Sequence, residues 1–383
     1  MGKIKNIVKN LIIKGLDEWD KCMVAHLRKG EMRKISDPKR KSILSETVLS
    51  EKQKQKIDKL FIENYGSKIP YYWHQYFTAY TGKFDEAYFP ELLFVPEFEH
   101  FMNQNESYID VFADKNIIPM IAKANEIKMP KSFFSCVYGI YRDENNIITK
   151  NEFEKRMSNI GRAFVKPSID SSSGQGCFPI NMVNGIDTIS GKSVSDISNE
   201  IGNNFVVQEM IKCHKCILNI YSKSVNTFRI ITYRWNDKIE VMPVIMRIGK
   251  GNSVIDNAHA GGMFIAVDET GKLGDIAFTE FRDKFTEHPD THLTFKDYQI
   301  EHYFEIIEAA KKMHTAIPQL GVYNWDFTID EDGNPVLIEA NTIGGSIWMP
   351  EMAHGKGVFG ENTADILKWT KKMKMISKSK RYL

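Results

Sequence analysis

Apolar residues recur at helical spacing near the start of the chain, and this pattern predicts helices over much of residues 1–65. Asp37-Pro38 interrupts the pattern. A second, charged helix is expected over residues 51–62, because Ser50 is a typical N-cap residue and an acidic residue follows it. The apolar positions of the first helix, which have lysines between them, are Ile4, Ile7, Val8, Leu11 and Ile12.

From about residue 110, short apolar runs alternate with longer helical patterns. Two of the expected strands flank residues 330–334, which have the composition of a turn, so these strands form a predicted hairpin. Because helices are interleaved with hairpin-type strand pairs, the sequence predicts an α+β or mixed fold and not a clean doubly wound sheet. The expected helices cover residues 115–127 and 298–316, and the expected strands cover residues 163–167, 205–208, 227–234, 238–248, 325–329 and 335–340.

The composition is typical of a globular protein, with 42% hydrophobic and 26% charged residues, so a wholly disordered chain is excluded. No apolar run approaches the length of a membrane-spanning helix, and the N-terminus lacks the apolar core of a secretory signal. Five cysteines in a chain of 383 residues fit a reducing compartment. We therefore expect a cytoplasmic protein.

Positive charge is concentrated at the start of the chain. Residues 1–60 contain 16 Lys/Arg and eight Asp/Glu, whereas the whole protein has a formal net charge of +2. Two interpretations of residues 1–41 stay open. The commoner one is a helix packed on its own protein with its lysines in water, and the other is peripheral contact with the inner face of an anionic membrane.

Residues 66–100 are rich in aromatic side chains, which could stack on nucleic-acid bases or fill a core. Only Lys68 and Lys83 are available there to track phosphates. Core packing is therefore favoured, and no nucleic-acid partner is expected.

Three polar residues of the last hairpin form the strongest candidate site. Asp326 and Glu339 lie at similar distances from the centre of the turn, which places them opposite one another with Cβ atoms about 5 Å apart. Asn341 shares their face because side chains alternate along a strand. Apolar neighbours bury this region, so the carboxylates need a cation, and hard oxygen donors suit Mg²⁺. The competing interpretation is a solvated acidic face.

A lysine followed by a loop of small residues is the second candidate. Lys166 closes an expected strand, and the Ser/Gly-rich segment after it would let backbone N–H groups approach phosphate oxygens. Arg229 and Arg247 lie on consecutive expected strands, where guanidinium groups suit carboxylate or phosphate. Surface ion pairing would explain either arginine alone. Cys213 and Cys216 form a lone C-x-x-C pair, for which a metal or redox role is not favoured.

The order of these motifs resembles the ATP-grasp superfamily. The chain contains Asp114-Lys115, the lysine and Ser/Gly loop, a strand ending in Gln208-Glu209, the arginine hairpin and the Asp…Glu-x-Asn hairpin, in that order. Residues 226–229 and 256–262 are similar to the α-L-glutamate ligase branch. The strongest resemblance, over about residues 66–370, is to the bacterial ATP-grasp family associated with sugar transfer and surface-polysaccharide gene clusters.

The resemblance implies an ATP-grasp fold, in which two α+β lobes clasp ATP, with an N-terminal helical, basic extension. The implied divisions are residues 1–65 for the extension, 66–130 for an aromatic-rich region, 131–211 for lobe A with the phosphate loop, and 212–383 for lobe B with the metal-binding hairpin and a C-terminal helix.

The resemblance also implies roles for individual residues. The implied ligands of one or two Mg²⁺ ions are Asp326, Glu339 and Asn341. The implied catalytic residues are Arg229, Arg247 and Asn257. The residues implied to bind ATP are Lys115, Lys166, Ser171, Ser172, Ser173, Gly174, Gln175, Gly176, Gln208, Glu209, Met210, Ile211 and His214.

The implied activity is ATP-dependent ligation of a carboxylate to an amine through an acyl phosphate. By family association, the substrates would be an amino acid and a sugar acid or amino sugar of surface polysaccharide synthesis. One alternative is a kinase of the same fold that phosphorylates a hydroxyl, and another is a non-catalytic, nucleotide-binding scaffold at the membrane. The absence of a G-x-S-x-G motif agrees with a reaction that forms no covalent enzyme intermediate. The sequence does not indicate the oligomeric state.

Overall fold

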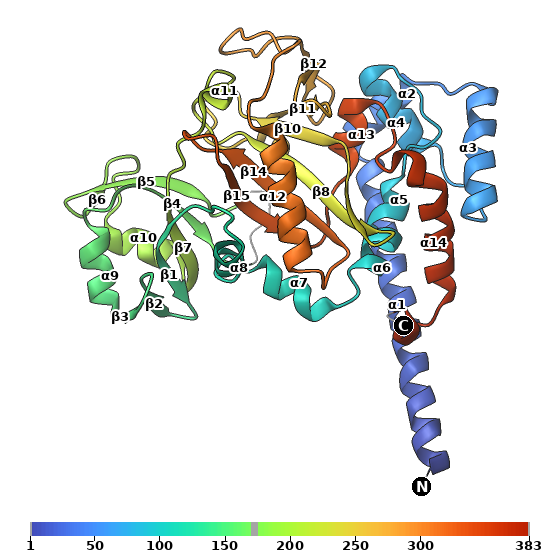
Figure 1. Ribbon diagram of the computed structural model, residues 1–383, viewed down its shortest axis with the longest axis horizontal. Coiled ribbons are helices and arrows are strands. Elements are labelled where there is room, and N and C mark those ends of the chain that lie inside the picture. The colour runs from blue at the N-terminus through green and yellow to red at the C-terminus, as the bar shows by residue number, and fades with distance from the viewer. Residues whose placement is uncertain (1, 170–174, 382–383) are drawn as a thin grey trace.

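Two antiparallel β-sheets organise the protein (Figure 1). The computed structural model describes residues 2–169 and 175–381. The smaller sheet has seven strands in the order β3-β2-β1-β7-β4-β5-β6. The larger has eight, in the order β13-β12-β11-β10-β8-β14-β15 with β9 paired to β8. Helices pack against both sheets, so the predicted α+β fold class is confirmed.

The smaller sheet packs against two short helices, α9 (Lys150–Met157) and α10 (Val194–Ile201). Thr149 and Ser193 begin these helices with capping boxes, which satisfy backbone N–H groups at the helix starts. The strands are β1 (Ser132–Val137), β2 (Ile140–Arg142), β3 (Ile147–Ile148), β4 (Gly161–Pro167), β5 (Phe178–Val183), β6 (Ile186–Asp187) and β7 (Asn204–Glu209).

The larger sheet carries the long helix α12 (Tyr303–Ala316) on one face (Figure 1). Ile306 and Met313 of this helix belong to the same buried cluster as Ile230 and Phe327 of the sheet. The strands are β8 (Thr227–Trp235), β9 (Lys238–Val241), β10 (Val244–Ile248), β11 (Met263–Val267), β12 (Leu273–Phe278), β13 (Lys284–Phe285), β14 (Val322–Ile329) and β15 (Pro335–Asn341).

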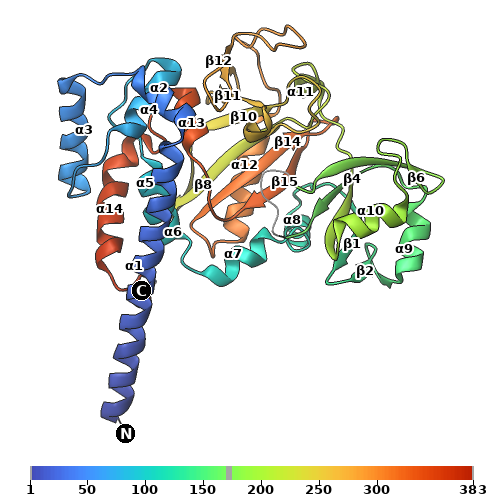
Figure 2. The same cartoon turned by 180° about the vertical axis from the view of Figure 1, so that it is seen from behind.

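Helices from both ends of the chain pack against one part of the opposite face of the larger sheet (Figure 2). Ile231 of β8 and Val322 of β14 point to this face and are fully buried there. Because side chains alternate along a strand, Arg229 and Asp326 share this second face. The candidate site and the terminal helices therefore occupy neighbouring parts of the same sheet face.

The helices of the N-terminal region confirm the sequence prediction for residues 1–65. Ser50 and Gln53 form a capping box that starts α3 at the predicted residue, and the helix ends at Asn64. The helices that follow one another here are α1 (Gly2–Ile35), α2 (Pro38–Ser45), α3 (Glu51–Asn64), α4 (Tyr72–Thr81), α5 (Glu91–Leu93), the π-helix η1 (Phe94–Glu99) and α6 (His100–Met102). At the other end of the chain lie α13 (Trp348–His354), α14 (Thr363–Met375) and the 3₁₀ turn η4 (Lys378–Lys380).

Most of the aromatic residues of the region 66–100 fill cores, as predicted. Eight of them are fully buried and contribute to two clusters that join the terminal helices to the larger sheet. They are Trp73, Tyr76, Phe77, Tyr80, Tyr88, Phe89, Phe94 and Phe98.

Three predicted elements have different limits in the structure. The helix expected over residues 298–316 begins at Tyr303, because His302 adopts a left-handed conformation with φ 62°. The helix expected over residues 115–127 is reduced to α8 (Ile118–Ala124). The strand expected over residues 238–248 is divided into β9 and β10, because Pro243 lacks the N–H that a continuous ladder needs.

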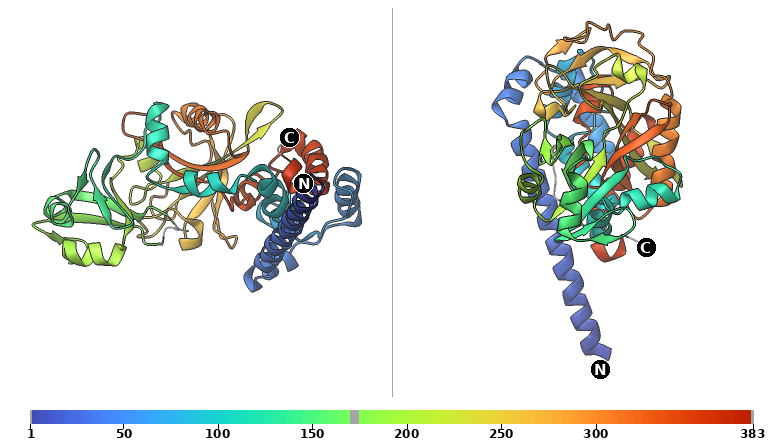
Figure 3. Two further views of the ribbon diagram at one scale, coloured as in Figure 1. Left: turned by 90° about the horizontal axis from the view of Figure 1, so that it is seen from below. Right: turned by 90° about the vertical axis from the view of Figure 1, so that its left-hand side faces the viewer.

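The first half of α1 extends away from the rest of the molecule, as two views at right angles show (Figures 1 and 3). Within the described residues, none of the helices combines the length and the apolar character that crossing a membrane requires.

Candidate active site

The hairpin of β14 and β15 brings Asp326 and Glu339 face to face, because the two residues pair directly in the strand register. The turn at residues 330–334 alone would place residue 338 opposite Asp326. The register shifts by one residue just beyond Asp326, and Ile338 is the extra residue of this bulge. The predicted opposition of the two carboxylates is therefore confirmed, and the bulge is part of its cause.

Two arginines hold the carboxylate of Asp326. Arg229 lies directly opposite Asp326 on β8, and its Nε and Nη2 donate to Oδ1 and Oδ2 at 2.6 and 3.2 Å. Nη2 of Arg247, on the next strand, is 2.9 Å from Oδ2. Burial alone would raise the pKa of Asp326, but the two guanidinium groups outweigh it and hold this pKa below its usual value. Asp326 is therefore an ionised, buried carboxylate at the centre of the site.

Arg247 is in turn held by Thr227 and Asp256, which sequence reasoning left without a role. The Thr227 hydroxyl accepts hydrogen bonds from Nε and Nη2 of Arg247 at 3.0 and 2.6 Å and donates to Asp256 at 2.5 Å. Asp256 Oδ2 also lies 3.7 Å from Arg247 Nε. Burial raises the pKa of Asp256, and Arg247 opposes this shift. The sequence signal for Thr227 and Asp256 was their membership of the segments 226–229 and 256–262, which resemble the α-L-glutamate ligase branch.

Two lysines approach the same hairpin from the smaller sheet and the linker before it. Lys115 Nζ forms an ion pair with Glu339 Oε1 at 2.9 Å, and Lys166 Nζ donates to the carbonyl of Ile338 at 3.4 Å. The backbone N–H of Lys115 donates to the carbonyl of Ser168, which ties the linker to the end of β4. Burial lowers the pKa of Lys166 to about 8; Glu339 opposes this shift and the charge of Lys115 adds to it.

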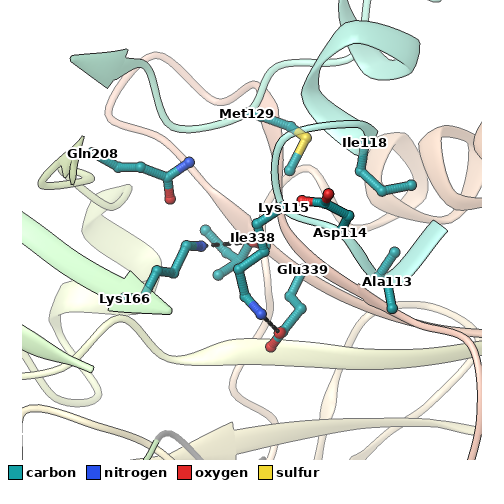
Figure 4. A pocket seen from close by; sticks show the side chains of 10 residues that line it. Ala113, Asp114, Lys115, Ile118, Met129, Lys166, Gln208, Ile338 and Glu339 are labelled. Atoms are coloured by element: carbon teal, nitrogen blue, oxygen red, sulfur yellow. Dashed lines mark hydrogen bonds and ion pairs between the residues drawn. The ribbon is translucent and has the colours of Figure 1, made fainter. Parts of the chain in front are cut away.

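A pocket opens between the two lysines and Glu339, and its side chains converge from three parts of the chain (Figure 4). Asp326, Asn341 and the two arginines are not among its lining residues. Lys115 and Lys166 point into it from opposite sides, with Glu339 below them (Figure 4). Gln208, near the end of β7, adds an amide to the lining and donates to Ser132 Oγ at 3.1 Å. The remaining lining residues are Ala113, Asp114, Ile118, Met129, Ile338 and Ala340. A site with apolar walls and converging charges is typical of small-molecule binding.

A pair of amides continues the hairpin face beyond the carboxylates. Asn324 pairs with Asn341 in the register, and Asn324 is fully buried. Within the described chain, neither amide atom of Asn324 nor Nδ2 of Asn341 has a hydrogen-bond partner. Gly345 lies directly against Asn324, since a Cβ at Gly345 would lie only 2.0 Å from Asn324 Nδ2. The sequence indicated Asn341 through the Glu-x-Asn motif but gave no reason to select Asn324.

Several residues that the resemblance assigned to ATP are not among the pocket's lining residues. The Glu209 carboxylate accepts from the backbone N–H of Lys131 at 2.8 Å. Met210 and Ile211 follow β7 in an irregular segment. His214 caps the short helix α11 (Lys215–Leu218), and its ring meets that of His302 edge-on, with the centroids 5.3 Å apart.

Ser171, Ser172, Ser173 and Gly174 lie outside the described residues. Gln175 and Gly176 form a turn before β5, where Gly176 has a positive φ of 72°. The side chain of Asn257 accepts from the backbone N–H of His259 at 2.9 Å and so starts a short 3₁₀ turn beside Asp256.

The two cysteines of the C-x-x-C pair are buried and not bonded to one another. Cys213 Sγ lies 3.7 Å from the Thr328 hydroxyl, and Cys216 Sγ lies 3.2 Å from Nδ1 of His214. Their environment is that of packed core thiols.

Solved structures that match the chain share little sequence with it. N5-carboxyaminoimidazole synthase from Aspergillus clavatus, in complex with ADP and 5-aminoimidazole ribonucleotide, is 13% identical, with a TM-score of 0.36 over 65% of this chain and 51% of that one. D-alanyl-alanine synthetase A from Vibrio cholerae is 14% identical, with a TM-score of 0.39 over 68% and 66%. The D-Ala:D-Ser ligase VanG from Enterococcus faecalis is 15% identical, with a TM-score of 0.41 over 69% and 62%.

This chain thus spans about half to two thirds of the length of these structures. No curated protein matches it significantly. The family described as sugar-transfer associated ATP-grasp matches residues 94–366, which include both sheets and the hairpin of Asp326 and Glu339. Because this match spans well over half of its residues, the chain belongs to the sugar-transfer-associated ATP-grasp family.

Proposed function

We propose that the protein is an ATP- and Mg²⁺-dependent ligase that joins a carboxylate to an amine through an acyl phosphate. The observation that carries this proposal is the convergence on one hairpin of Lys115 with Glu339 and of two arginines with Asp326. ATP would lie between lobe A, residues 131–211, and lobe B, residues 212–383. Lys115 and Lys166 would hold its phosphates, and the segment 171–176 would close over them.

The hairpin residues fit a magnesium site by their chemistry. Asp326 and Glu339 would offer carboxylate oxygens from adjacent strands in exchange for their present contacts with arginine and lysine, and Asn341 adds an amide on the same face. These are hard donors, few in number, which suits an ion that keeps waters and binds phosphate oxygens. When bound, Mg²⁺ would neutralise negative charge on the phosphates.

The proposed reaction has two steps. A carboxylate oxygen of the acid attacks the γ-phosphorus of ATP, the bond from this phosphorus to the β,γ-bridging oxygen breaks, and ADP leaves. The amine then attacks the acyl carbon, gives up a proton and expels phosphate as the amide forms. Arg229 and Arg247 would stabilise the charge of the transferred phosphoryl group, and Asn257 would lie near the acceptor. Such chemistry needs positioning and charge more than a nucleophilic side chain.

We further propose that the substrates are an amino acid and a sugar acid or amino sugar used in surface polysaccharide synthesis. The family description, which connects these proteins with sugar transfer, supports this choice. A screen of ADP release over pairs of amino acids and uronic acids or amino sugars, with product masses, tests it. An amide product supports the ligase. A phosphorylated hydroxyl without an amide would show a kinase instead.

The variants Asp326→Asn and Glu339→Gln test the metal-binding hairpin. Each keeps the size of its side chain but removes a charge, so we expect ADP release to fall at least about a hundredfold, in the range that loss of phosphate-charge stabilisation produces. The exposed pair Asp365→Asn and Glu361→Gln on the C-terminal helices is the matched control and should keep wild-type activity. Wild-type ADP release by the hairpin variants, with unchanged circular dichroism, would contradict the metal assignment.

A further inference from the structure

The part of α1 before Asp17 extends away from the body of the protein (Figures 1 and 3). From Asp17 onward, the helix is fastened to the body. Asp17 accepts hydrogen bonds from Ser377 Oγ and the backbone N–H of Lys378, and Arg28 forms an ion pair with Glu97 at 2.6 Å. With a rise of 1.5 Å per residue, residues 2–16 form a projecting rod about 22 Å long.

This projecting segment displays apolar side chains to solvent. On a helix with about 100° between successive residues, the exposed apolar positions from 8 to 19 fall within an arc of about 140°, and the half-buried Ile13 lies about 60° beyond Leu16. A continuous apolar strip of this kind on a protein surface marks an interaction site. The exposed fractions are 50% for Val8, 64% for Leu11, 58% for Ile12 and 44% for Leu16. Trp19, 46% exposed, continues the strip just beyond the segment, and Lys378 Nζ lies 4.6 Å from the centroid of its ring.

Positive charge borders this strip on both sides. By the same helical spacing, Lys9 lies just beyond Leu16 at one edge, and Lys14 lies beyond Leu11 at the other. Both lysines are exposed, and neither forms an ion pair within residues 2–169 and 175–381. In sequence, residues 1–16 contain four lysines and no Asp or Glu.

The acidic residues farther along α1 do not offset this charge, because each has a cationic partner or is bonded to the body. Glu18 pairs with Lys21 at 2.8 Å. Asp20 is held by Arg381 and His100, both at 2.8 Å. Asp17 is bonded to the C-terminal turn, as described above. The projecting segment is therefore a purely cationic, amphipathic helix.

We propose that residues 2–16 dock on the surface of an anionic phospholipid bilayer. Val8, Leu11 and Ile12 would enter the boundary between headgroups and acyl chains, while the flanking lysines would meet the lipid phosphates. Charge complementarity favours this occupant over a second copy of the chain. Two such helices packed side by side would bring their lysines together, whereas an anionic bilayer offers the opposite charge along the whole strip.

Flotation of the full chain with vesicles tests this proposal. We expect the protein to float with phosphatidylcholine vesicles that contain phosphatidylserine, and to remain largely unbound with phosphatidylcholine alone. Binding should weaken as salt is raised, because salt screens the contacts between lysine and lipid.

Variants separate the apolar and the electrostatic contributions. Leu11→Ser with Ile12→Ser should lower vesicle affinity at least about tenfold, because the variant loses two aliphatic side chains that would be buried in the bilayer. Lys9→Gln with Lys14→Gln should lower it roughly fivefold per lysine. Matched controls on other helices are Ile62→Ser with Phe304→Ser, and Lys52→Gln with Lys59→Gln. The controls are exposed positions too and should bind as wild type does.

The proposal is wrong if the Leu11 and Ile12 variant floats like the wild type. It is also wrong if the wild-type chain fails to float with the vesicles that contain phosphatidylserine. A dimer in light scattering that this variant dissociates would then identify a second copy as the partner. ADP release measured without vesicles should be unchanged in the variant. This result keeps a failure of membrane docking distinct from a failure of the ligase proposal.

Discussion

Lys166 illustrates how burial tunes a single residue of the candidate site. Its folded-state pKa of about 8 lies below the unfolded value of 10.5, so the unfolded chain binds more protons between these values. Lys166 therefore adds to the free energy of unfolding as pH rises through this window. Its charge, however, is lost from the folded protein over the same window. As pH rises, the contribution of Lys166 to stability should therefore increase, while its contribution to phosphate binding should decrease.

We expect the affinity for ATP to fall above about pH 8, by up to roughly tenfold per pH unit, because the deprotonated amine no longer attracts phosphate. Titration of the dissociation constant from pH 7 to 9.5 measures this decline. Lys166→Arg keeps its charge throughout this range, so its affinity should stay level. An equal decline in both proteins would show that another group causes the pH dependence.

At the scale of elements, buried carboxylates shape the loop that follows β15 and Asn341. The carboxylate of Glu99, at the end of η1, accepts from the N–H groups of Gly344 and Gly345, both at 2.9 Å. Glu91 of α5 accepts from the N–H of Ile347 at 2.8 Å. The helices of the region 91–99 therefore set the path of a loop that lies directly against the amide pair of the site.

Burial raises the pKa of Glu99 to about 8, against the opposing effect of the N–H groups of Gly345 and Gly344. Because this folded-state value lies above the unfolded value of 4.5, the contribution of Glu99 to stability is fully present below pH 4.5 and is lost as pH rises through 8. We expect the free energy of unfolding in urea to fall between pH 5 and 8. Glu99→Gln cannot titrate, so the decline should be smaller in this variant.

The exposed substitution Glu63→Gln is the matched control for this measurement and should retain the wild-type pH dependence. The same decline in Glu99→Gln as in the wild type would assign it to other carboxyl groups. Glu351 is one such group, since burial also raises its pKa.

The elements that could be predicted from sequence are those with a local cause. The capping box at Ser50 and the turn at residues 330–334 are local signals, and both led to correct elements. The left-handed conformation of His302, which delays α12, has no such signal. The bulge at Ile338 was also invisible, although the predicted pairing of Asp326 with Glu339 depends on it.

The contacts within the site could not be predicted from local signals either, because they join residues that are far apart in the sequence. Arg229 and Asp326 were both selected from sequence, but their direct pairing depends on β8 and β14 being neighbours in the sheet. No pattern within either strand specifies that neighbour. Asp256 and Asn324 were missed for a related reason, because their importance lies in partners, or in the lack of partners, that only the folded chain defines.

At the scale of the whole molecule, residues outside the family match contribute to the core inside it. The family match begins at residue 94, but Leu49, Ile57 and Phe61 from before it are nearly or fully buried. They share one cluster with Ile231 of β8 and with Leu367 of α14. The N-terminal helices thus complete the second face of the larger sheet, next to the strands that carry the site.

Two deletions distinguish the parts of this N-terminal region. Burial of three large apolar side chains stabilises the fold by roughly 5–9 kcal/mol at about 1.5–3 kcal/mol each, which is comparable with the whole stability of a typical domain. Deletion of residues 1–65 should therefore give a chain that unfolds or aggregates. Deletion of residues 1–16 removes only the projecting rod and should leave the thermal midpoint within about 2 °C of wild type. Calorimetry of both proteins tests these two expectations. A cooperative transition near the wild-type midpoint in the protein that lacks residues 1–65 would show that the larger sheet is stable without the N-terminal helices.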